Sequence, residues 1–95
     1  MNTDLPPDVR HDPLAMRFAL ELEGHLAVLD YQLADGKIVF THTHVPDELG
    51  GRGIGSRLAR AGLEHARTQG LKVVPLCSFI AGYIQKHPEY QDLLE

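Results

Sequence analysis

The 95-residue sequence predicts a single domain of the α+β class. Three observations lead to this prediction. The first half of the chain contains three segments that alternate apolar and polar residues, a long helical pattern follows, and a short apolar segment comes after it. We therefore expect an antiparallel three-strand meander and one parallel strand, packed with a long crossover helix and a short C-terminal helix.

The three strands of the meander are expected over residues 16–22, 26–33 and 38–45. Glu23-Gly24 separates the first two, and Asp35-Gly36 separates the second from the third. Asp-Gly between alternating segments is a strong hairpin signal, because such a turn needs residues that tolerate positive φ. Residues 1–13 are polar and contain three prolines, so we expect a flexible N-terminal arm there and the domain over residues 14–95.

The long helix is expected over residues 54–69, where apolar residues recur at helical spacing. Gly70 is placed to end it. Residues 72–76 should form the strand parallel to the third strand, because a crossover helix joins the two. Ser78 is expected to cap a second helix that ends near residue 87, and Pro88-Glu89 to start one last turn.

Charge and cysteine content argue against several functional classes. The net charge is −4, whereas nucleic-acid binders usually carry a basic excess. One cysteine allows no intrachain disulfide, which is typical of a reducing compartment. Neither a signal peptide nor an apolar segment of membrane-spanning length is visible. We therefore expect a cytoplasmic protein without nucleic-acid or membrane partners.

The most informative segment is Gly50-Gly51-Arg52-Gly53-Ile54-Gly55-Ser56, which lies between a predicted strand and a predicted helix. Its glycines leave backbone N–H groups uncovered, and a helix start adds unpaired donors and a positive dipole end. Such a turn can bind a phosphate or diphosphate, and Arg52 would add a charged fork. The alternative is a flexible turn that only begins the helix. A P-loop and a dinucleotide fingerprint do not fit the spacing.

Together with Val45-Pro46 and Leu58, this segment resembles the acetyl-CoA motif of the GNAT N-acetyltransferase superfamily, Gln/Arg-x-x-Gly-x-Gly/Ala. Gly53 and Gly55 match the two small positions, and Gly50 replaces the usual Gln or Arg. The chain is still more similar to the very small, single-domain GNAT-like proteins. The similar segments are Phe40-Thr41-His42-Thr43, Val45-Pro46, Val74-Pro75-Leu76-Cys77, Tyr83-Ile84 and His87-Pro88-Glu89-Tyr90.

This resemblance, which covers nearly all residues from Met16 onward, implies a minimal GNAT fold that lacks the family's first helices and last strands. It implies that acetyl-CoA or coenzyme A binds with its pantetheine between the third strand and the parallel strand. Unpaired backbone groups in such a gap need partners, and the pantetheine amides can supply them. The expected cofactor-binding residues are His44, Val45, Gly50, Gly51, Arg52, Gly53, Ile54, Gly55, Ser56 and Tyr83.

Acyl transfer to an amine needs a base, a donor to the carbonyl oxygen and an acid for the leaving thiolate. His42 and His44 share one face of a strand, and His42 is the candidate base, with a packed or surface histidine as the alternative. Cys77 either accepts the acetyl group or lines the pocket. By resemblance, Tyr83 would protonate the thiolate; otherwise it is a half-buried core residue. No metal site is expected, because no third ligand accompanies the two histidines.

Three functions are open at this point. The first is an acetyl-CoA-dependent N-acetyltransferase that acts on a primary amine of a small molecule or protein. The second is a non-catalytic CoA-binding or sensing module that acts through a protein partner. The third is a small structural domain that binds no CoA. The sequence leaves the acceptor open, and also the choice between a monomer and a weak homodimer.

Overall fold

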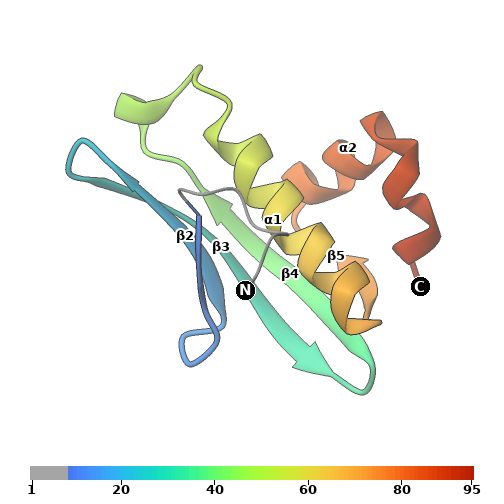
Figure 1. The fold of residues 1–95 in the computed structure, drawn as a ribbon. Coiled ribbons are helices and arrows are strands. Elements are labelled where there is room, and N and C mark those ends of the chain that lie inside the picture. The colour runs from blue at the N-terminus through green and yellow to red at the C-terminus, as the bar shows by residue number, and fades with distance from the viewer. Residues whose placement is uncertain (1–8) are drawn as a thin grey trace.

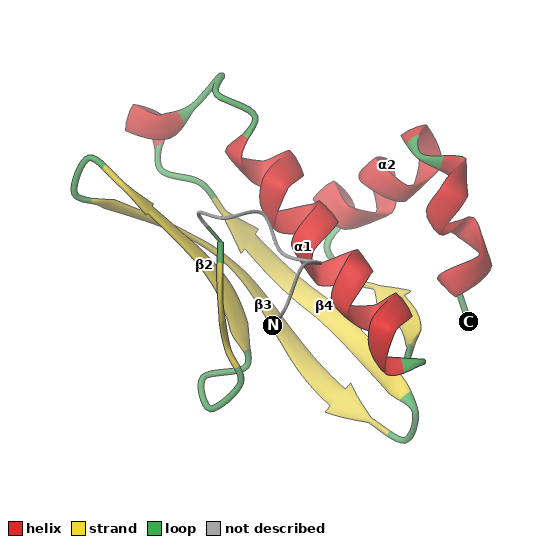
Figure 2. Ribbon diagram, in the orientation of Figure 1, coloured by secondary structure: helices red, strands yellow, loops and turns green. Residues whose placement is uncertain are grey.

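The structure is a computed structural model that describes residues 9–95. It contains one five-stranded sheet in the order β1-β2-β3-β4-β5, with the helices packed on one face (Figures 1 and 2). The strands are β1 (Arg10–Asp12), β2 (Arg17–Leu22), β3 (His25–Ala34), β4 (Lys37–His44) and β5 (Lys72–Pro75). The helical elements are η1 (Asp47–Leu49), α1 (Ile54–Gln69), α2 (Ser78–Lys86) and η2 (Pro88–Leu93).

The predicted fold class is confirmed. Strands β2, β3 and β4 form the antiparallel meander, and β5 pairs with β4 in parallel after the crossover through α1. The β2–β3 turn has positive φ at Glu23 (54°) and Gly24 (78°), and Gly36 in the β3–β4 turn has φ 66°. The two positive φ values of the β2–β3 turn match the twist of the strands that it joins.

The N-terminal part of the chain differs from the prediction. Residues 1–8 of the expected flexible arm lie outside the described residues, but Arg10–Asp12 forms β1 and pairs with β2. Val9 is 5% exposed and belongs to the core, and the His11 ring stacks on Phe18 at 4.3 Å between centroids. These contacts between distant residues stabilise a strand in a segment whose own composition is polar.

The long helix has the predicted bounds, Ile54–Gln69, and ends at Gly70 in the left-handed conformation (φ 68°). There the Gly70 N–H donates to the carbonyls of Ala66 and Arg67, which would otherwise lack a partner at the helix end. The capping prediction for the second helix was wrong: Cys77 is the N-cap of α2, and Ser78 is its first helical residue. The last turn at Pro88 is present as η2.

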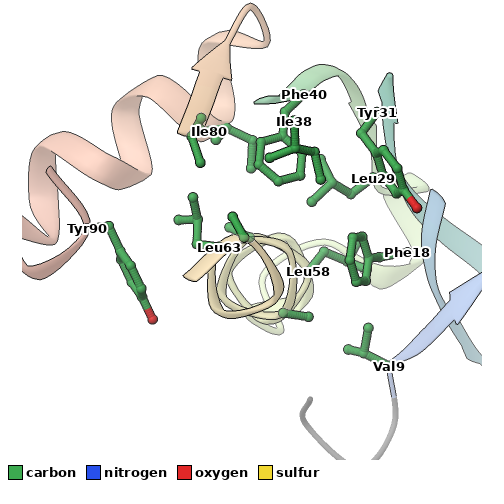
Figure 3. Close-up of a cluster of buried hydrophobic side chains, with 14 of the residues drawn as sticks. Val9, Phe18, Leu29, Tyr31, Ile38, Phe40, Leu58, Leu63, Ile80 and Tyr90 are labelled. Atoms are coloured by element: carbon green, nitrogen blue, oxygen red, sulfur yellow. The ribbon is translucent and has the colours of Figure 1, made fainter. Parts of the chain in front are cut away.

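The core lies between the sheet and the two helices (Figure 3). Phe18, Leu29 and Phe40 face α1 from three strands, and Ile80 closes the core from α2. At the far edge of the sheet, the Glu95 N–H donates to the Val73 carbonyl at 3.3 Å. Across residues 9–95, no helix has the length and apolar character required to cross a membrane.

Candidate functional site

The glycine-rich turn is held in the core at both of its ends. Leu49 before it and Ile54 after it are 0% and 1% exposed, respectively. Between them, Gly51 (φ 77°) and Gly53 (φ 72°) are left-handed, a conformation that glycine adopts without the steric cost of a Cβ. The Gly53 carbonyl accepts the N–H of Arg57, so the preceding N–H groups have no intrahelical partner. The turn therefore presents main-chain donors at a positive helix end.

A cavity of about 340 Å³ lies beside this turn. All of the predicted cofactor residues line it except His44, Arg52 and Tyr83. A second cavity, of about 250 Å³, lies between α1 and α2 and shares Ser56 and Phe79 with the first. Tyr83 and Lys86 line this second cavity. The two cavities adjoin at Ser56 and Phe79 and together form one hollow beside α1 and α2.

Phe79 lines both cavities and lies close to the start of α1. A Cβ at Gly55 would lie 2.8 Å from Phe79 Cζ, so this position needs glycine if the ring is to stay where it is. Phe79 is 41% exposed although it is a large apolar residue. Its ring is therefore available to a ligand that enters the hollow.

Strand β5 pairs with only the first part of β4. Their pairing ends at Phe40 and Pro75, and the Cys77 N–H makes one further bond to the Phe40 carbonyl at 3.0 Å. Beyond that point β4 continues to His44 while pairing only with β3. Backbone groups of residues 41–44 that point away from β3 thus have no strand partner, which is the gap expected from the sequence.

Cys77 lies at this gap, and its Sγ is 3.1 Å from Thr43 Oγ1. Burial raises the pKa of the Cys77 thiol, but the Thr43 hydroxyl and the N–H groups of Ile80 and Phe79 outweigh burial, so the net pKa is lowered. A helix N-terminus favours a thiolate in the same way. The site therefore combines a turn with exposed main-chain donors, an open strand edge and a thiol with a lowered pKa.

Comparison with known proteins places these features in one family. The family model of the GCN5-related N-acetyl-transferase matches residues 17–93. The chain belongs to this family. It is 37% identical to Protein NATD1 of Homo sapiens over 86 residues, covering 87% of this chain and 76% of that protein. Protein NATD1 of Gallus gallus is also 37% identical, with 87% and 78% covered.

A solved structure shares the fold as well. The NMR structure of a GCN5-like protein from Staphylococcus aureus is similar to this one, with a TM-score of 0.72. The two sequences are 34% identical, and the similarity covers 99% of this chain and 91% of the other. The likeness therefore extends over nearly the whole chain.

Within this GCN5-related domain, the two histidines lie away from Cys77. His42 and His44 share a face, as predicted, with nearly parallel rings (7°) whose centroids are 6.4 Å apart. Thr43, between them, pairs with the buried Leu29 and points to the helix-covered face. His42 and His44 therefore point to the uncovered face, on the other side of the sheet from Cys77.

Tyr83 lies at a third location, away from both Cys77 and the two histidines. Its ring stacks on His87 at 3.9 Å between centroids, near the C-terminal end of α2, whereas Cys77 is the N-cap of that helix. Burial is the largest cause that raises the pKa of Tyr83. The structure thus brings Cys77 and Thr43 together and keeps His42 and Tyr83 apart from them.

Two residues of the site were missed at the level of sequence. These are Thr43, which belongs to one of the similar segments, and Phe79; neither was among the predicted site residues. Neither carries a motif of its own, because the role of each depends on a residue that is distant in the chain: Cys77 for Thr43, and Gly55 for Phe79. The described residues also contain no cluster of His, Cys, Asp and Glu that could hold a metal ion.

Proposed function

We propose that this chain is an acetyl-CoA-dependent N-acetyltransferase that acts on a primary amine of a small molecule or protein. The observation that carries the proposal is the continuity of the site in a GCN5-related domain. A cavity bordered by the main-chain donors of residues 50–56 leads along α1 and α2, next to the gap where Cys77 meets Thr43. When bound, acetyl-CoA supplies the activated acetyl group.

In this proposal, each part of the site has a role that follows from its position. The N–H groups of the glycine-rich turn bind the diphosphate, and the open edge of β4 offers backbone partners to the pantetheine amides. Cys77 lies at the gap with a lowered pKa, which suits either a nucleophile or a pocket thiol that orients the acetyl group. Tyr83 lines the second cavity, along the cofactor.

His42 is the base in this proposal. It lies on the uncovered face of the sheet, opposite the cavity side, so an amine that reaches the gap from that face meets its imidazole. Proton removal by an imidazole nitrogen of His42 is then compatible with cofactor entry from the helix side. The acceptor and the cofactor approach the gap from opposite faces.

Calorimetric titration with coenzyme A tests the binding step. We expect binding by the wild type and a loss of at least about tenfold in Gly53→Ala, because a Cβ at positive φ costs about 1–2 kcal/mol and reshapes the donors. Gly36→Ala is the matched control: it has the same left-handed conformation and open surroundings, but lies in the β3–β4 turn. Equal affinity of both variants would contradict the proposed cradle.

Turnover is tested separately, with acetyl-CoA, a panel of primary amines and detection of released thiol. We expect turnover by the wild type and a loss of turnover in His42→Gln at unchanged coenzyme A affinity. Tight coenzyme A binding without turnover on any amine would instead support the non-catalytic CoA-binding module.

A further inference from the structure

The tip of the glycine-rich turn is tied to a hairpin that takes no part in the site described above. Arg52 donates two hydrogen bonds to the Glu23 carboxylate, from Nη1 to Oε2 at 2.9 Å and from Nη2 to Oε1 at 3.1 Å. Glu23 lies in the turn between β2 and β3, with φ 54°. Figure 1 shows this turn beside η1 and the start of the glycine-rich segment. Paired N–H donors of a guanidinium on one carboxylate give a defined geometry.

A second link joins the same two segments. Nδ1 of His25, at the start of β3, lies 3.8 Å from Oε1 of Glu48 in η1. The hairpin therefore approaches the segment before α1 at two points. Both links involve side chains at the outer surface, in contrast to the buried Leu49 that fixes the segment from inside.

The tip is open where side chains would pack. Among the described residues, a Cβ placed at Gly51 or at Gly53 would meet no atom within 4 Å. Glycine also loses more conformational freedom on ordering than any other residue. Arg52 itself does not line the cavity, and its guanidinium is turned to Glu23 instead.

We propose that Glu23 and Arg52 form a brace that holds the glycine-rich turn in the shape that binds the cofactor's diphosphate. In this proposal, which rests on the proposed function, Glu23 is a positioning residue. Arg52 acts through the shape of the turn and does not touch the diphosphate. The β2–β3 hairpin thereby becomes a part of the cofactor site, although none of its residues lines the cavity.

A direct contact between Arg52 and the diphosphate predicts the opposite effect of removing the Glu23 charge. If Arg52 were a direct ligand of the diphosphate, Glu23 would compete with the cofactor for its guanidinium. Removing the Glu23 charge would then strengthen coenzyme A binding. Under the brace proposal it weakens binding, so the sign of one measurement separates the two arrangements.

The test is a double-mutant cycle in coenzyme A affinity. We expect Glu23→Gln and Arg52→Gln each to weaken binding by about 2- to 5-fold, the range for an exposed ion pair. We expect the double variant to be no weaker than either single one. Exchanging the charges, Glu23→Arg with Arg52→Glu, should restore most of the affinity. Asp92→Asn is the control, because it breaks a similar exposed pair with Arg67 away from both cavities.

Amide hydrogen exchange in the protein without ligand gives a second readout. Glu23→Gln should speed exchange at Gly51 and Gly53 while leaving Gly36 unchanged. Stronger or unchanged coenzyme A binding in Glu23→Gln overturns the brace, as does additive weakening in the double variant. If the wild type binds no coenzyme A, the proposed function fails by itself. Unchanged exchange in Glu23→Gln would then reject the brace as a structural element too.

Discussion

Thr43 and Cys77 show how a single hydroxyl can set the chemistry of a thiol. Their side-chain atoms are 3.1 Å apart, although the residues belong to different elements. Burial alone would raise the pKa of Cys77 and suppress the thiolate, and the hydrogen bonds from Thr43, Ile80 and Phe79 reverse that effect. The balance makes Cys77 more acidic than an ordinary buried cysteine.

Thr43→Val should raise the pKa of Cys77, because it removes the hydroxyl and leaves burial in place. The measurement is the rate of iodoacetamide alkylation of Cys77 as a function of pH, whose midpoint should move to higher pH in the variant. Thr41→Val is the control, since the Thr41 hydroxyl bonds the Asp30 carbonyl at 3.3 Å and not the thiol. A midpoint that moves equally in both variants would show that the Thr43 hydroxyl is not the cause.

At the scale of elements, the packing of α1 on the sheet depends on a glycine in the helix interior. A Cβ at Gly62 would lie 2.9 Å from both Leu29 Cδ2 and Phe40 Cε1, so these side chains of β3 and β4 pack directly against the helix backbone. Glycine inside a helix is unfavourable by about 1 kcal/mol relative to alanine. Close packing of the crossover helix offsets that cost.

Gly62→Ala should therefore destabilise the fold, by about 1–2 kcal/mol, since overpacking a core costs about 1–3 kcal/mol and outweighs the gain in helix propensity. Gly82→Ala in α2 is the matched variant, because a Cβ there would meet nothing within 4 Å. It should stabilise the protein by up to about 1 kcal/mol. Urea unfolding measures the sign of the change in unfolding free energy for both variants. A stabilising Gly62→Ala would contradict the close approach.

For the whole molecule, His11 joins four elements at one end of the core. Its ring stacks on Phe18 of β2, its Nε2 lies 2.6 Å from the Tyr31 hydroxyl of β3, and His65 of α1 meets it edge-on at 4.5 Å. Burial lowers the pKa of His11, His65 lowers it further, and the neighbouring Asp12 opposes them. The neutral imidazole therefore fits the folded state better than the charged one.

The sign of the pH effect follows from this lowered pKa. As the pH falls below 6.5, His11 becomes protonated in the unfolded chain before it does in the folded protein. Its contribution to the unfolding free energy is therefore fully present above pH 6.5. It is lost as pH falls from 6.5 towards the lowered pKa of the folded state. Urea unfolding between pH 8 and 5 should show that the unfolding free energy falls more steeply with decreasing pH in the wild type than in His11→Gln.

His42→Gln, at an exposed histidine, is the control for that pH series. Its unfolding free energy should follow the wild-type dependence on pH. Equal slopes for the wild type and His11→Gln would show that the acid sensitivity of the fold arises elsewhere.

Much of the architecture was already determined by the sequence itself. The bounds of α1, the stop at Gly70, the turns at residues 23–24 and 35–36, and the glycine-rich segment before α1 all agree with the structure. Each of these features depends on residues that are neighbours in the chain, because turn conformations and helix periodicity are local properties. Local spacing therefore specified where the glycine-rich turn forms.

Only the tertiary structure decided which side chains meet. Thr41 has no register partner opposite it in β3, and this bulge lets both Phe40 and Thr43 face the helices while His42 faces away. Residues that are distant in the chain are likewise joined by the pairing of β1 with β2, by the Cys77–Thr43 contact and by the Glu23–Arg52 brace. Such contacts form when the sheet packs against α1 and α2. The alternation of residues along one strand does not predict them.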